Sequence, residues 1–292
     1  MSTTVTTPSA GIGRGFSRWL HPKRRTRIAG LIGAPALWLL VLYIGSLVAL
    51  FLNSAYSLNE DGSGIDKTLT LGNYREITKQ VYRDVAVRTI VIALAVTVID
   101  VLLALPLAFF IAKLSKRRWR SVLVAAVLVP LWASYLVKAF AWRALVGSPG
   151  GVLDATFGRS PGYGEVSLVV VLAYLWLPYM VVPIYAGFER LPDSLLEASG
   201  DLGARFGVTF RRVVLPMVVP SVVAGSIFTF SLSLGDYIAV GLVGGKTQMI
   251  GSVVYSNFAS NLPLAAAYAL VPVVVMVLYL VAVRRSGALE HL

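Results

Sequence analysis

The strongest constraint on the fold is a series of six apolar stretches, each long enough to cross a lipid bilayer. A spanning helix needs about 20 consecutive, mostly apolar residues. Only 14% of the chain is charged, against about 25% in soluble domains. The stretches are continuous rather than alternating, which argues against a β-barrel. The sequence therefore predicts an all-α membrane protein with six transmembrane helices, at residues 30–52, 87–112, 121–145, 166–188, 213–235 and 264–283.

The basic residues are distributed unevenly over the links between these stretches. Seventeen of the 26 Lys and Arg residues fall on one side, and six fall in the opposite loops. This positive-inside bias predicts that both termini are cytoplasmic. It also accounts for the net charge of +12 without nucleic acid, which we do not expect as a partner. The expected organisation is a basic tail at 1–29, a membrane domain at 30–283 with a cytoplasmic loop at 189–212, and a tail at 284–292.

The residues that usually carry catalysis or bind metals are scarce. The chain has no cysteine, and its two histidines, His21 and His291, lie near the ends. Neither a phosphate-binding G-x4-G-K-[ST] loop nor an H-E-x-x-H motif occurs. We therefore expect a non-catalytic chain that binds no cofactor. A membrane-embedded enzyme and a gradient-driven secondary transporter are the alternatives from other functional classes.

The loop after the fourth stretch reads as two short helices separated by a turn. Ser194 at the N-cap, with Glu197 three residues later, forms a capping box, which is typical of a helix start. Gly203 can adopt a positive φ and turn the chain. Phe206 and Phe210 are four residues apart and should lie on one face of the second helix. The structural alternative for Glu197 is a cap that contacts nothing else.

The pattern E-A-S-x3-G-x9-V-x-L-P runs from Glu197 to Pro216 in this loop. It resembles the EAA motif of ABC importer permeases, E-A-A-x3-G-x9-I-x-L-P, with Ser199 and Val213 as mild departures. The resemblance implies the type I (MetI-like) permease fold. It also implies that the loop supplies coupling helices, which dock on an ATPase subunit. The docking residues implied by the motif are Glu197, Ala198, Ser199, Gly203 and Pro216.

Three more stretches, at 69–74, 134–142 and 235–245, look like stretches of the same family. Together they resemble the spermidine/putrescine branch, in particular its first (PotB-like) permease. This implies a permease subunit in a bacterial inner membrane that carries polyamines. Permeases for an amino-acid derivative, thiamine or a phosphonate remain alternatives.

The resemblance also implies partners. They are an ATPase dimer that uses ATP and Mg, a second homologous permease subunit and an extracytoplasmic solute-binding protein. ATP would be hydrolysed by the ATPase dimer and not by this chain.

Charged residues inside a bilayer are costly and often mark a transport path. Asp100 and Lys138 fall within the second and third stretches, and Asp236 falls where the fifth ends. The levels of Asp100 and Lys138 differ by roughly 9 Å at 1.5 Å per residue, which a lysine side chain can only just span, so the sequence leaves an ion pair between them open. The structural alternatives are a packed carboxyl group and packed aromatic rings. The residues predicted to line a path are Asp236, Tyr237, Asp100, Tyr135, Lys138 and Trp176.

Two short helices are predicted outside the spans. Asn73 could cap a surface helix that runs to about Tyr82. The segment from Met249 to Phe258 could form a helix at the membrane interface.

Overall fold

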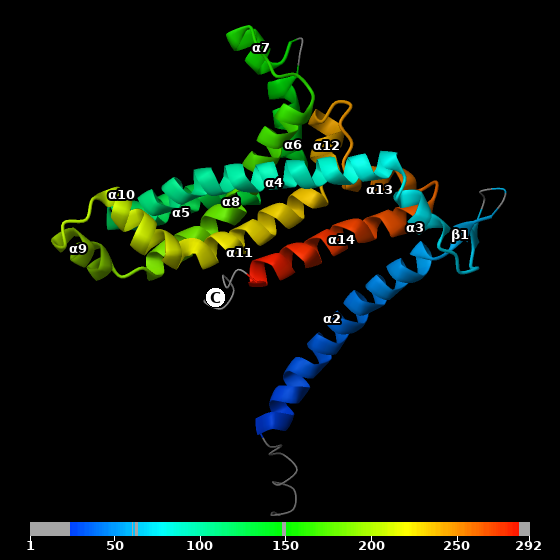
Figure 1. Ribbon diagram of the computed structural model, residues 1–292, viewed down its shortest axis with the longest axis horizontal. Coiled ribbons are helices and arrows are strands. Elements are labelled where there is room, and N and C mark those ends of the chain that lie inside the picture. Colours follow the sequence, from blue (N-terminus) through cyan, green and yellow to red (C-terminus); the bar gives the residue numbers. More distant parts are fainter. Residues whose placement is uncertain (1–23, 60, 62–63, 148–149, 286–292) are drawn as a thin grey trace, which may run out of the picture. The chain divides into compact units, whose positions relative to one another are not determined.

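A computed structural model describes residues 24–59, 61, 64–147 and 150–285 of the chain. Most of the predicted tail at 1–29, and most of that at 284–292, lie outside these residues. The described residues form helices and one short hairpin (Figure 1). The elements are α2 (Arg24–Ser54), β1 (Ser57–Leu58), β2 (Ile65–Asp66), α3 (Gly72–Ile77), α4 (Gln80–Phe109), η1 (Phe110–Leu114), α5 (Arg117–Trp132), α6 (Tyr135–Val146), α7 (Val152–Phe157), α8 (Glu165–Arg190), α9 (Asp193–Asp201), α10 (Phe206–Thr209), η2 (Phe210–Val214), α11 (Leu215–Leu234), α12 (Ile238–Val243), α13 (Ile250–Phe258) and α14 (Leu262–Arg285).

Five helical segments of the described chain are long and apolar enough to cross a membrane. They lie in α2, in α4 with η1, in α8, in α10 with η2 and α11, and in α14. A sixth span is formed if α5 and α6 count as one, but these two helices meet at a bend of 91°. The prediction of six apolar spans is thus confirmed with one difference, because the third span is broken.

The break in the third span lies at Ala133 and Ser134. Their ψ angles are 138° and 135°, so the backbone leaves the helical region at both residues. Pro130 lies one turn earlier and has no N–H to donate, which weakens the helix on that side. The bend places Tyr135 at the first position of a new helix rather than in the middle of a continuous one.

Residues 1–52 and 53–292 form two separate units. The described part of the first unit is most of α2, an apolar helix with Pro35 inside it. The second unit contains all the remaining elements.

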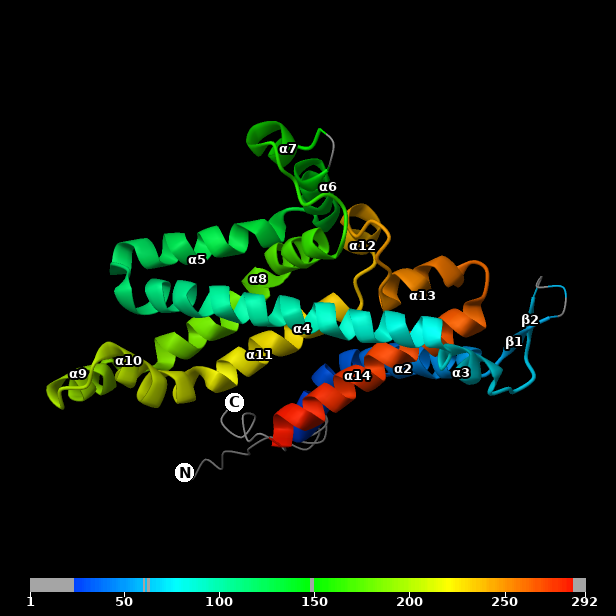
Figure 2. The ribbon, with the colours of Figure 1, turned by 45° about the horizontal axis from the view of Figure 1, so that its top comes forward.

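Helix α8 is the centre of the second unit, because it packs against both α4 and α11. Figure 2 shows α4 running along this unit from α3 towards α10. Two apolar clusters fill the contacts between these helices. One includes Val96 and Leu172, and the other, nearer to η1 and η2, includes Ala108, Ile184 and Val218.

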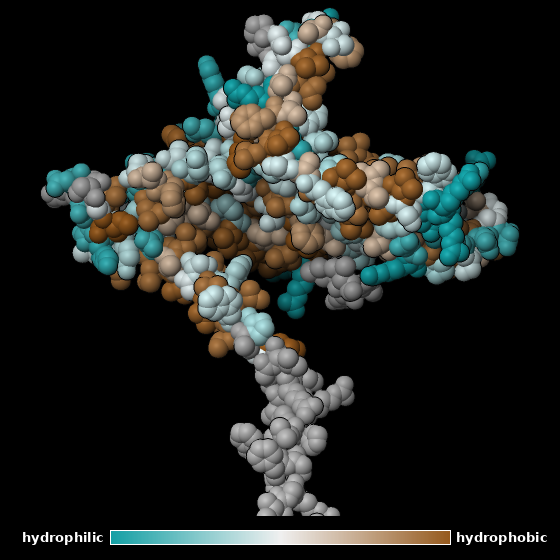
Figure 3. All heavy atoms as spheres, turned by 180° about the vertical axis from the view of Figure 1, so that it is seen from behind, coloured by the Kyte–Doolittle hydropathy of each residue, from teal (hydrophilic) through white to brown (hydrophobic). Residues whose placement is uncertain are grey.

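The two ends of the second unit carry different short helices (Figure 1). We call the end with α9 and α10 the loop end, and the end with α3 and α13 the far end. In Figure 3, hydrophilic side chains gather at both ends, and apolar side chains cover much of the surface between them. One exposed apolar stripe on α4 consists of Val87, Val91, Leu94, Val98 and Leu102. This distribution is that of helices embedded in an apolar medium.

The short helix α3 differs from its prediction. It begins at Gly72 after Leu71, without a side-chain cap, and ends at Ile77. The Asn73 amide instead donates hydrogen bonds to the carbonyl oxygens of Ser54 (3.0 Å) and Tyr56 (2.6 Å). Asn73 therefore ties α3 to the chain preceding the hairpin, and the prediction of an Asn73 cap is wrong. Helix α13 confirms the predicted helix at Met249–Phe258 to within one residue.

Candidate functional site

The first helix of the 189–212 loop, α9, starts two residues earlier than the capping box predicts. Its N-cap is Pro192, and no side chain caps it by a hydrogen bond. The prediction of a capping box between Ser194 and Glu197 is therefore wrong. Asp193 lies in the first turn, where a carboxylate suits the positive end of the helix dipole, and its side chain accepts a hydrogen bond from Lys113 (2.5 Å).

The turn after α9 is built on Gly203. Its φ of 75° confirms the predicted positive φ, which costs other L-residues roughly 1–2 kcal/mol. The N–H groups of Leu202 and Ala204 close the end of α9 on the carbonyl oxygens of Ala198 (3.2 Å) and Ser199 (3.1 Å). Gly203 thus turns the chain directly from α9 towards α10.

Two contacts hold α10 and η2 in place after this turn. The Ser199 and Thr209 hydroxyl oxygens are hydrogen-bonded at 2.7 Å, which joins α9 to α10. The EAA pattern has an alanine at this position, and an alanine could not form this hydrogen bond. Ser199 therefore adds a contact between α9 and α10 that the usual residue of the motif lacks. The ring centroids of Phe206 and Phe210 are 6.0 Å apart, which confirms that the two rings share a face. Pro216 follows η2 in the first turn of α11.

The loop exposes both apolar and acidic side chains. Glu197 and Ala198 are exposed, and Ser199 is half-buried. Leu202 is 88% exposed and Phe206 is 67% exposed. Large apolar side chains on a surface of this kind are typical of a protein-binding patch. Sequence reasoning missed Leu202, although a leucine between the end of α9 and a turn glycine has few neighbours against which to pack.

A second candidate site lies where α11 gives way to α12. Asp236 is buried there, and the Tyr135 hydroxyl donates a hydrogen bond to its Oδ2. The Ala239 N–H donates to its Oδ1 at 2.9 Å. The Trp176 ring stacks on Tyr135 with centroids 5.7 Å apart and an interplanar angle of 23°. Together with Tyr237, these side chains line a cavity of about 320 Å³.

Four of the six residues predicted to line a path therefore meet in one cavity: Asp236, Tyr237, Tyr135 and Trp176. Asp100 and Lys138 are not among its lining residues. Asp100 is fully buried in α4, and neither of its carboxyl oxygens has a hydrogen-bond partner. No carboxylate of the described residues lies within 4.0 Å of Lys138.

One residue that lines the cavity at Asp236 also has an unused hydrogen-bond donor. The Trp176 Nε1 atom is buried and has no partner. The cavity thus offers a carboxylate and aromatic rings. In the described part of the chain, no three His, Cys, Asp or Glu side chains gather as a metal ion requires.

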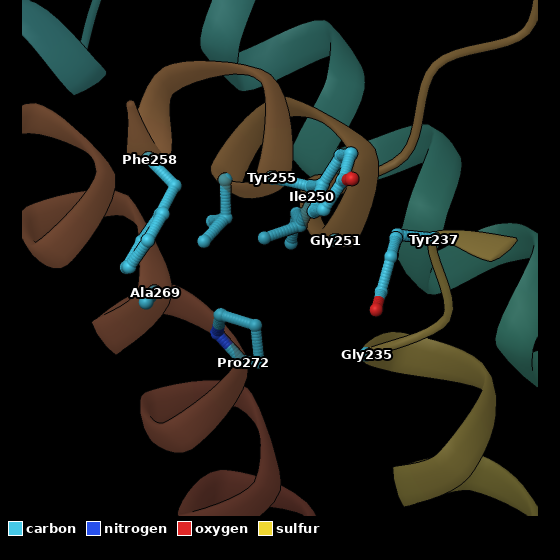
Figure 4. Close-up of a pocket in the computed structure, with 9 residues that line it drawn as sticks. Gly235, Tyr237, Ile250, Gly251, Tyr255, Phe258, Ala269 and Pro272 are labelled. Atoms are coloured by element: carbon cyan, nitrogen blue, oxygen red, sulfur yellow. The ribbon is translucent and has the colours of Figure 1, made fainter. Parts of the chain in front are cut away.

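A larger apolar cavity of about 510 Å³ lies on the other side of Tyr237 (Figure 4). Its wall includes α13, α14 and the Gly235–Tyr237 segment, which it shares with the smaller cavity. The rings of Tyr237 and Tyr255 stack there with centroids 4.6 Å apart. Gly235 and Tyr237 therefore line both cavities.

Span-length helices with an exposed loop at one end and a cavity that contains a buried carboxyl group are the features of a membrane transport subunit. Residues 104–288 match the family described as "Binding-protein-dependent transport system inner membrane component". The chain therefore belongs to this family and is a permease subunit of an ABC importer.

Two relatives from Escherichia coli (strain K12) cover most of the chain. The inner membrane ABC transporter permease protein YdcU is 39% identical over 282 residues, which is 90% of each chain. The spermidine/putrescine transport system permease protein PotB is 28% identical over 262 residues, or 86% of this chain and 94% of PotB. These similarities confirm the resemblance that the EAA pattern indicates.

Solved structures show the same fold. A chain of a bacterial alginate ABC transporter, solved with an alginate-bound periplasmic protein, superposes with a TM-score of 0.72 at 13% identity. The match covers 89% of this chain and 93% of the other. A chain of the MetNI methionine ABC transporter gives a TM-score of 0.54 at 18% identity, covering 71% and 97%. The predicted type I permease fold is thereby confirmed, whereas the side on which the termini lie stays a prediction.

Proposed function

We propose that this subunit forms part of the path for a polyamine such as putrescine or spermidine across a bacterial inner membrane. The observation that carries the proposal is the Asp236 carboxylate, buried beside aromatic rings in a cavity between helices. An ammonium group is attracted by a carboxylate and by the faces of aromatic rings. A carboxylate has about four acceptor positions, and the hydrogen bonds from Tyr135 and Ala239 occupy two of those on Asp236.

The similarity to PotB supports the same solute class, because the name of that relative specifies spermidine and putrescine. The Asp236 carboxylate and the aromatic rings of the cavity support a cationic solute independently of the name of that relative. A buried carboxylate repels anions, so the cavity disfavours a phosphonate.

A second candidate solute is favoured by one observation. The Trp176 Nε1 atom is buried and unpaired, so it could donate a hydrogen bond to a solute once the indole ring turns towards the cavity, and polyammonium ions have no acceptor to receive such a bond. A cationic amino-acid derivative carries both an ammonium group and acceptor oxygens. Such a solute would use Asp236 and Trp176 together.

The partners in this proposal follow from the type of permease. An ATPase dimer would dock on the exposed face of the 189–212 loop, on the cytoplasmic side, and hydrolyse ATP with Mg. A second homologous permease would complete the path, and an extracytoplasmic binding protein would deliver the solute. The loop would then follow the closure of the ATPase, because binding biases the populations of the inward- and outward-facing states.

Uptake by the reconstituted complex tests the solute class. Vesicles with the permease subunits, the ATPase and the binding protein should accumulate radiolabelled putrescine or spermidine when ATP is supplied. A cationic amino-acid derivative and aminoethylphosphonate serve as comparison solutes. Uptake of the amino-acid derivative alone would favour the second candidate, and uptake of the phosphonate alone would contradict the role assigned to Asp236.

A further inference from the structure

One ammonium group joins the end of α4 to the beginning of α9. Lys113 lies in the π-helical turn η1 that follows α4, and its side chain is only 10% exposed. Its Nζ donates hydrogen bonds to the Leu191 carbonyl oxygen (2.6 Å) and to Asp193 Oδ1 (2.5 Å). These acceptors flank Pro192, the N-cap of α9. Lys113 therefore fixes the point at which the chain leaves α8 and starts the 189–212 loop.

Asp193 stays ionised at neutral pH. The hydrogen bond from Lys113 and the positive charge of Lys113 hold the pKa of Asp193 below its usual value, and the charge of Arg120 acts in the same direction. A depressed carboxylate pKa means that the contact is present above the ordinary aspartate range and is lost only as the pH falls through the lowered pKa. Asp193 is exposed, so the contact adds little to stability, and its main effect is on position.

The same end of α4 contacts the second half of the loop through an aromatic cluster. Phe109 lies one turn before Lys113. Its ring centroid is 5.4 Å from that of Phe188, 5.8 Å from that of Phe206 and 6.1 Å from that of Phe210. Helix α4 is thus attached to the beginning of the loop by a charged contact and to its end by aromatic packing.

At its other end, α4 is connected to the walls of the two cavities. The Ile250 N–H donates a hydrogen bond to the Thr89 hydroxyl of α4 (2.9 Å), which attaches α13. Helix α13 lies against the segment that carries Asp236, because a Cβ atom at Gly251 would lie 2.6 Å from the Asp236 carbonyl oxygen. Helix α4, about 45 Å long at 1.5 Å per residue, therefore contacts the loop near one end and the α13 wall near the other.

We propose that Lys113 is a positioning residue that transmits displacement of the 189–212 loop to α4. The inference rests on the proposed docking of an ATPase at this loop. It adds a specific recipient of the movement, α4, and a contact outside the EAA pattern. Helices α8 and α11 are joined to the loop by the backbone, whereas α4 packs against these two helices and contacts the loop itself through side chains such as those of Lys113 and Phe109.

A Lys113→Met variant tests this inference, because methionine retains the apolar stem and removes the charge. We expect the variant complex to retain its ATPase subunit and to hydrolyse ATP. Solute uptake per ATP hydrolysed should fall by about tenfold, within the range typical of coupling between sites. Lys113→Arg should restore most of the ratio, because a guanidinium group can reach both acceptors.

The matched control is Lys79→Met. Lys79 also pairs with a carboxylate, that of Glu76 at 2.6 Å, but it lies just before the far end of α4. The Lys79→Met variant should leave the ratio of solute uptake to ATP hydrolysis unchanged. Unchanged uptake per ATP in Lys113→Met would overturn the inference. Loss of the ATPase from the Lys113→Met complex would also overturn it, because Lys113 would then serve the folding of the loop.

Failure of the proposed function has a different signature. If the wild-type complex neither retains an ATPase nor takes up solute with ATP, the docking role of the loop is refuted before any variant is compared. The inference about Lys113 is judged only on the ratio of uptake to hydrolysis in a working complex.

Discussion

Replacing Leu202 by glutamate is expected to release the ATPase subunit from the purified complex. Leu202 is 88% exposed and lies between the end of α9 and the Gly203 turn, in the middle of the EAA pattern. Glutamate at this position would place an unpaired charge in a contact from which water is excluded, which costs about 2 kcal/mol or more. A loss of about 2 kcal/mol weakens binding roughly 30-fold. Copurification of the ATPase with a tagged permease measures the effect.

The control for Leu202→Glu is Leu69→Glu. Leu69 is 75% exposed, and it precedes α3 at the far end of the unit. The same change there should leave the ATPase bound. Glu197→Lys and Gly203→Pro should weaken binding as Leu202→Glu does, by reversing a charge on the exposed face and by disrupting the positive-φ turn. Full retention of the ATPase by the Leu202→Glu complex would show that this face is not where the ATPase docks.

An Asp236→Asn variant is expected to lose at least about 90% of polyamine uptake. The amide can still accept the Ala239 hydrogen bond, so the start of α12 should remain folded. The charge that attracts an ammonium group is removed. Hydrogen bonds to charged groups contribute about 1.5–3 kcal/mol, which corresponds to a tenfold effect or more. Initial uptake rates in vesicles, at equal amounts of assembled complex, measure the loss.

Glu165→Gln is the matched control for Asp236→Asn. Glu165 pairs with Arg88 at 3.3 Å, and both side chains are substantially exposed to their surroundings. Removing that charge should leave uptake close to the wild-type rate. If Asp236→Asn also transports normally and hydrolyses ATP normally, the carboxylate serves only to hold Tyr135 and α12, and the cavity is not a solute site.

The sequence predicts the spans well because apolar composition alone determines which segments a membrane can accept. It does not reveal the bend in the third span. The stretch at 121–145 is mostly apolar, and the break occurs at Ala133 and Ser134, which leave the helical region without a glycine or proline at the bend itself. Apolar periodicity carries no information about such a change of direction.

The two candidate sites differ in how far the sequence predicts them. The EAA spacing and the Gly203 turn are local, so their positions follow directly from the residues. The contact of Lys113 with Asp193 joins residues 80 positions apart, and that of Tyr135 with Asp236 joins residues 101 apart. Contacts of this kind depend on how the helices pack. Helix packing also explains why the predicted capping box at Ser194 is wrong. The helix begins at Asp193, whose side chain is paired with the distant Lys113.

ATP-dependent uptake by reconstituted vesicles tests the central claim most directly. The chain and its permease partner are inserted with or without the ATPase subunit, and uptake of labelled polyamine is followed with and without ATP. The account predicts uptake only when both the ATPase and ATP are present. Uptake by the permease subunits alone, driven by an ion or solute gradient, would contradict the claim that this chain is driven by an ATPase docked on the 189–212 loop.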